Sequence, residues 1–164
     1  MIAVKDATMG IVARYQKKIY ALILYLVGQD QETAYDVCVA SFVEALRENP
    51  SPGREEVFML RLIGISIEKC RNVKTIPTYD IIDVLDIGRA EKEPLQVVLK
   101  ALQMIDHDLK VPLLLRYQLN LSYRDIGTVT CTSDANARIM AGQARAQLDK
   151  EIDHVLNKTM DRTI

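Results

Sequence analysis

The pattern of apolar residues from Leu121 to Leu148 restricts the possible folds of this chain more than any other stretch. It reads LSYRDIGTVTCTSDANARIMAGQARAQL, in which two short helical repeats meet at a polar turn. Ser122, with Asp125 three residues later, is placed to cap the first helix, and Ser133 is placed to cap the second. The spacing predicts a helix-turn-helix over about residues 122–148.

The second helix of this pattern has two different faces. At about 100° per residue, one face carries small apolar residues that permit a close helix crossing: Ala137, Met140, Ala141, Ala144 and Leu148. The opposite face carries Arg138, Ile139, Gly142, Gln143, Arg145 and Ala146, with Asn136 near its start. Arginine, glutamine and asparagine pair with base edges and phosphates, so this face is a candidate DNA-reading surface. A helical hairpin that packs only for structural reasons is the alternative, because only two of these side chains are cationic.

The first block, residues 10–73, carries three further helical patterns. Apolar residues from Ile11 to Val27 predict a buried helix that Gly28 ends. A third helix is predicted from Arg54 to Asn72. Between them, residues that recur at three- and four-residue steps predict an amphipathic helix, which stops at the sequence NPSPG. These residues are Ala34, Val37, Cys38, Ser41, Phe42 and Ala45.

Residues 74–94 are predicted to be an acidic inter-domain linker, because their helical pattern is weak and prolines interrupt it. A metal site there is a weaker interpretation, since the glycine and closing glutamate of a calcium loop are missing around Asp80, Asp83 and Asp86. The second block, residues 95–164, begins with a predicted helix at Leu95. A second predicted helix follows, in which Pro112 is tolerable only near the first turn.

The sequence therefore predicts an all-α protein of two small helical domains joined by an acidic linker, the C-terminal one a helix-turn-helix. No β alternation and no internal repeat is present. The 164 residues are 49% apolar and 26% charged, which is ordinary for a globular protein. With no signal-peptide layout and no apolar run near the ~20 residues of a membrane span, we expect a cytoplasmic protein without a membrane partner.

Charge and reactive residues exclude several functions. The formal net charge is −1, and eight Lys and Arg balance eight Asp and Glu from Ile105 onward, so we expect weak autonomous DNA binding. Cys38, Cys70 and Cys131 are widely spaced and are expected to be reduced thiols rather than disulfide or zinc partners. The two histidines have no partner at catalytic or metal-ligand spacing, so neither an enzyme nor a cofactor is predicted.

Taken together, the two blocks resemble bacterial RNA polymerase sigma factors of the extracytoplasmic-function group. IDHDLKVPLLLRYQLNLSYRDIGTVTCTSDANARIMAGQARAQL, residues 105–148, is similar to region 4 of that family, and its most specific pieces are LLLRYQLNLSYRDI and ARAQL. TAYDVCVASFVEALR, residues 33–47, is similar to region 2.2. The resemblance implies a helical specificity subunit with two partners, core RNA polymerase and promoter DNA. The family also allows an anti-sigma factor as a partner.

The resemblance implies a role for particular positions. The polymerase clamp would contact Asp36, Val39, Ala40 and Val43. The downstream promoter element would be melted and read around Phe58, Leu60, Arg61, Gly64, Ile65 and Lys69. The upstream element would be read by Asn136, Arg138, Ile139, Gln143 and Arg145, with Gly142 on the same face.

The chain departs from the family pattern at several of these contacts. Val39 and Ala40 replace a usual glutamine and acid, and Gly64 and Ile65 replace an expected arginine and asparagine. A working alternative sigma factor is the first interpretation. A sigma-like interaction protein that binds polymerase or an anti-sigma factor, with few promoter contacts, is the second. A dimeric repressor is a further option, but it leaves the first block unexplained.

Overall fold

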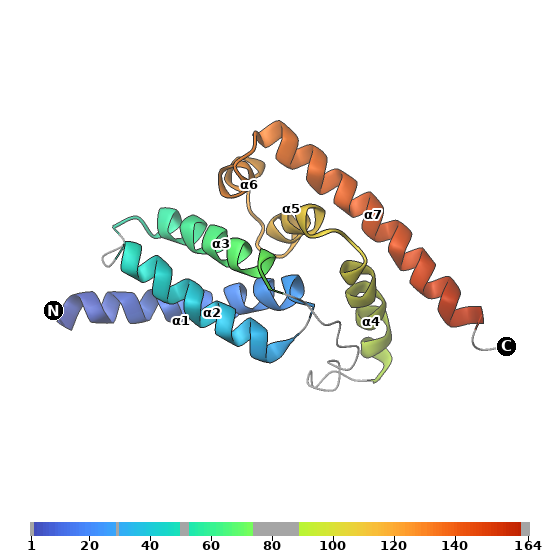
Figure 1. The fold of residues 1–164 in the computed structure, drawn as a ribbon, viewed down its shortest axis with the longest axis horizontal. Helices are drawn as coiled ribbons and strands as arrows, with labels where there is room; N and C mark the ends of the chain where they lie inside the picture. Colours follow the sequence, from blue (N-terminus) through green and yellow to red (C-terminus); the bar gives the residue numbers. More distant parts are fainter. Residues whose placement is uncertain (1, 29, 50–52, 74–88, 162–164) are drawn as a thin grey trace.

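The structure is a computed structural model that describes residues 2–28, 30–49, 53–73 and 89–161 (Figure 1). These residues form seven helices and no strand, which confirms the all-α prediction for the described part of the chain. The helices are α1 Ile2–Leu26, α2 Gln31–Glu48, α3 Glu55–Arg71, α4 Arg89–Gln103, α5 His107–Tyr117, α6 Tyr123–Thr130 and α7 Asp134–Asp161. The first three pack together, and α7 runs along the outer edge against α4, α5 and α6.

The helices of the first block end close to where the sequence predicts. Gly28 has a φ of 70°, in the left-handed region that ends α1 without a Cβ clash. Asp30 caps α2 by accepting a 3.2 Å hydrogen bond from the backbone N–H of Thr33. The start of α1 differs from the prediction, because the helix already begins at Ile2 rather than near Gly10.

In the second block, α4 begins at Arg89, within the stretch predicted as linker and before the expected Leu95 start. Pro94, which was predicted to be the last residue of the linker, lies inside this helix. Residues 74–88, which include the three aspartates considered as metal ligands, lie outside the described residues.

Pro112 lies inside α5 and past its first turn, contrary to the expectation. The helix starts after Asp106, whose carbonyl accepts from Lys110 N at 2.9 Å. Pro112 therefore deprives the Asp108 carbonyl of its helical donor. The proline ring is fully buried, so apolar packing offsets part of the cost of that missing hydrogen bond.

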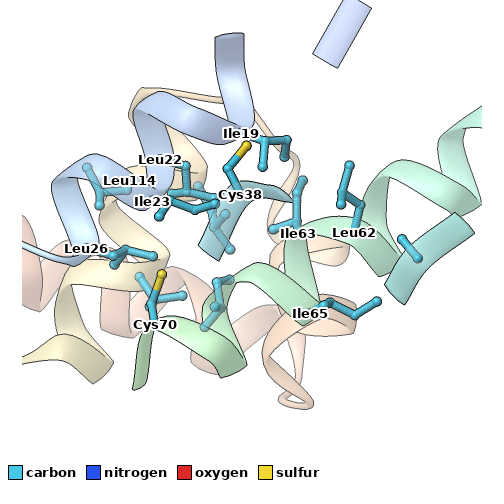
Figure 2. Close-up of a cluster of buried hydrophobic side chains, with 14 of the residues drawn as sticks. Ile19, Leu22, Ile23, Leu26, Cys38, Leu62, Ile63, Ile65, Cys70 and Leu114 are labelled. Carbon is cyan, nitrogen blue, oxygen red and sulfur yellow. The ribbon is translucent and has the colours of Figure 1, made fainter. Parts of the chain in front are cut away.

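One hydrophobic cluster joins the two blocks. Buried side chains of α1, α2 and α3 pack in it with five residues of the second block, namely Val111, Leu114, Leu115, Ile126 and Ala137. Figure 2 shows Leu114 of α5 beside Leu22 and Ile23 of α1. Since a buried leucine side chain contributes about 1.5–3 kcal/mol relative to an exposed one, this shared core holds the blocks together. An exposed ion pair between Arg71 and Asp108, 3.0 Å long, also connects α3 to α5.

The three cysteines are free thiols in the structure. Cys38 and Cys70 are part of the apolar core (Figure 2), and burial raises the pKa of Cys70 to about 12. Cys131 is exposed in the turn between α6 and α7. The two core thiols are therefore apolar packing groups with little thiolate at neutral pH.

Candidate functional site

Two serine caps and one residue with left-handed backbone build the junction of α6 and α7. The Ser122 hydroxyl accepts from Asp125 N at 3.1 Å and donates to the Asp125 carboxylate at 2.7 Å. Ser133 accepts from Asn136 N at 3.1 Å at the start of α7. Both predicted caps are therefore confirmed. Between the helices, Cys131 has a φ of 56°, which turns the chain in the left-handed region.

The two faces of α7 are separated as the sequence predicts. Ala137, Ala141 and Ala144 are buried, and Met140 and Leu148 are partly buried. The other face is exposed and carries Asn136, Arg138, Ile139, Gly142, Gln143, Arg145 and Ala146. All five predicted upstream-element residues are thus exposed on α7, away from its buried alanines.

The two arginines of this face have different surroundings. The Arg138 guanidinium lies 5.1 Å from the ring centroid of Tyr123 on α6. Arg145 donates a 3.2 Å hydrogen bond to the Tyr117 hydroxyl of α5, and its guanidinium lies 5.6 Å from that ring. Both cations therefore lie against aromatic rings and are paired with no carboxylate among the described residues.

A second candidate surface lies on the outer side of α2. Val39 and Val43 expose 45% and 49% of their surface, and Tyr35 one turn before them is also exposed. Together with residues of α1 they line an apolar groove of about 480 Å³. Asp36 and Ala40 are exposed on the same helix. Exposed apolar side chains next to a groove are typical of a protein-binding surface.

The predicted downstream-element residues on α3 are not brought together at the surface. Phe58 is 1% exposed and belongs to the core, and so does Ile65. Neither side chain reaches solvent in this structure, and their role in contacting DNA stays a prediction. Arg61 makes two hydrogen bonds, of 2.7 and 2.8 Å, to the Glu48 carboxylate of α2, which lowers the pKa of Glu48. Lys69 pairs with Glu44 at 2.6 Å.

Comparison with known proteins gives two relatives that match most of the chain, while no family model matches it. The RNA polymerase sigma-H factor of Pseudomonas aeruginosa is 28% identical over 169 aligned positions, covering 90% of this chain and 87% of that protein. The ECF RNA polymerase sigma-E factor of Haemophilus influenzae is 25% identical over 173 positions, covering 93% and 90%. The chain is thus similar to two sigma factors over about nine-tenths of its length, at low identity.

Several residues of the candidate surfaces were missed by sequence reasoning. Tyr35 lies on the same stripe of α2 as Val39 and Val43, at steps of four residues, so its position is readable from the sequence. Tyr117 and Tyr123 contact the arginines of α7 from other helices, and no spacing pattern in the sequence reports such contacts. An apolar groove of about 390 Å³ between α4, α5 and α7 was also not predicted.

Two features are absent from the part of the chain that the structure describes. No group of three or more His, Cys, Asp or Glu there is arranged to hold a metal ion. Within the same residues, no helix is long and apolar enough to cross a bilayer.

Proposed function

We propose that the protein is an alternative sigma factor that binds core RNA polymerase and directs it to particular promoters. The observation that carries this proposal is the exposed outer surface of α7, which presents two arginines, an asparagine and a glutamine to solvent. These side chains are the ones that make bidentate contacts with guanine and adenine edges and with phosphates. The likeness to two sigma factors over about nine-tenths of the chain supports the same function.

The outer face of α2 is proposed as the polymerase-docking surface. Its exposed valines and Tyr35 would be covered by the partner, which removes apolar surface from water. Asp36 on the same face supplies a charge that fixes the register of docking without adding much affinity. The second block carries equal numbers of basic and acidic residues, so it would bind DNA weakly by itself. Affinity for the promoter would then depend on the bound polymerase.

We propose that the upstream element carries most of the promoter recognition made by this chain. Arg138 and Arg145 are exposed and form no ion pair among the described residues, whereas Arg61 and Lys69 are paired with Glu48 and Glu44. A DNA contact by either α3 cation would first require its ion pair to break. The Arg61 pair is exposed and therefore weak, so breaking it only reduces the gain from contacting DNA.

The proposal is tested by a core-binding measurement with a matched control. Val39→Glu places a charge in the apolar docking surface and should weaken binding to core polymerase at least tenfold, or about 1.4 kcal/mol. Because Val39 is nearly half exposed, the melting temperature should change little. Val57→Glu, on α3 and also exposed, is the control and should bind core normally. Equal binding by both variants would remove α2 as the docking surface.

A further inference from the structure

The ring of Tyr123 connects three helices of the second block. The Arg116 guanidinium of α5 and the Arg138 guanidinium of α7 each lie 5.1 Å from the centroid of this ring. Tyr123 is the first residue of α6, is partly buried, and packs against the hydrophobic cluster. Two cations thus share one aromatic ring whose own position is fixed by packing.

Arg116 fixes the chain immediately before this ring. Its Nη1 atom donates a 2.9 Å hydrogen bond to the carbonyl oxygen of Leu121, in the loop that leads from α5 to α6. The Ser122 cap follows directly, so the backbone on the N-terminal side of Tyr123 is held by two side-chain contacts. The ring is therefore a rigid support against which a more mobile side chain can rest.

Arg138 is such a side chain. It is exposed, and no carboxylate or carbonyl oxygen pairs with it among the residues that the structure describes. An arginine in water samples many rotamers, and binding a base edge requires that this freedom be lost. A ring contact restricts the rotamers before DNA arrives. No side-chain N–H of Arg138 makes a hydrogen bond within the described residues, so its donors stay available.

We propose that Tyr123 is a positioning residue for promoter recognition, whose ring pre-orders the Arg138 guanidinium and leaves its N–H donors available for a base edge. This inference rests on the proposed function of the α7 face. Arg145 differs, because one of its N–H groups already donates a hydrogen bond of 3.2 Å to the Tyr117 hydroxyl. A full bidentate base contact is thus better suited to Arg138, and a phosphate contact to Arg145.

The test is transcription in vitro with core polymerase on a promoter pool whose upstream element is randomised, using the full chain. Tyr123→Phe keeps the ring and should keep the sequence preference. Tyr123→Met keeps much of the apolar volume without a ring, and should reduce discrimination roughly two- to five-fold, the loss of one exposed cation–π contact. The reduction should fall at the base position where Arg138→Ala loses preference, and combining the two changes should add nothing. Arg124→Ala, an exposed arginine on the same helix, controls for charge and should leave the preference unchanged.

Discrimination is a ratio between sequences in one pool, so a smaller folded fraction of Tyr123→Met does not change it. Full discrimination by Tyr123→Met, or equal loss in Tyr123→Phe and Tyr123→Met, would overturn the positioning role while the wild type still selects promoters. A wild-type protein without any preference would instead overturn the proposed function, and this inference with it.

Discussion

Alanine at Gly127 should destabilise the protein because of the close approach between α6 and the start of α7. A Cβ atom at this position would lie 2.7 Å from the carbonyl oxygen of Thr132, 3.2 Å from Ser133 C and 3.3 Å from Asp134 N. All three are backbone atoms of the turn, so no side-chain rotation relieves the contact. Overpacking of this kind costs about 1–3 kcal/mol, against a gain of about 1 kcal/mol from the better helix propensity of alanine.

Gly142 provides a matched control, because it is also a helical glycine but faces open space. A Cβ atom there meets nothing within 4 Å, so Gly142→Ala gains helix propensity without a clash. The propensity contribution is common to both variants and cancels in their difference. The two free energies of unfolding should therefore differ by about 1–3 kcal/mol, which separates the melting temperatures by about 2–12 °C for a chain of this size.

The assay is thermal and urea unfolding of both variants followed by circular dichroism. The urea slopes should match that of the wild type, because the surface exposed on unfolding is unchanged. If Gly127→Ala proved as stable as Gly142→Ala, the close contact between α6 and the start of α7 would be refuted. The orientation of α7 relative to α6 would then be refuted as well.

Two further changes test local features of the fold. Ser122→Ala should lower the free energy of unfolding by about 1 kcal/mol in urea titrations, because the Asp125 backbone N–H loses its acceptor; an unchanged value would show that this cap is not stabilising. Lys110 is buried, and burial lowers its pKa. The folded state then binds fewer protons than the unfolded state between the two pKa values, and its stability rises with pH up to the unfolded value near 10.5. Lys110→Met should therefore stabilise the protein at pH 7, with a gain that shrinks towards pH 10.5; a gain independent of pH would contradict this cause.

The features that the sequence predicted well are those set by local spacing. The alanines of α7 recur at three- and four-residue steps, and this alone determines which side of the helix is buried. Ser122 and Ser133 each accept a hydrogen bond from a backbone N–H only three residues away. The exposed valines of α2 follow from the same helical period.

The features that were missed depend on contacts between distant parts of the chain. The apolar residues of α3 cover a wide arc, so periodicity could not decide whether Phe58 and Ile65 face the core or a partner. Arg61 finds its acceptor on α2, and the period of α3 does not contain that information. The first residues of α4 are mostly charged and carry little apolar pattern, which is why the sequence placed the start of that helix at Leu95 instead of Arg89.

The central claim is that the exposed face of α7 selects promoters when the chain is bound to core polymerase. Its most direct test is transcription from a pool with a randomised upstream element, with wild type, Arg138→Ala and Arg145→Ala compared at several salt concentrations. Wild type should enrich one upstream motif. Arg138→Ala should change that motif, whereas Arg145→Ala should weaken all sequences alike and reduce the log–log salt slope by about one. Polymerase binding by all three proteins with the same unselective output would contradict the claim and leave α7 as scaffold.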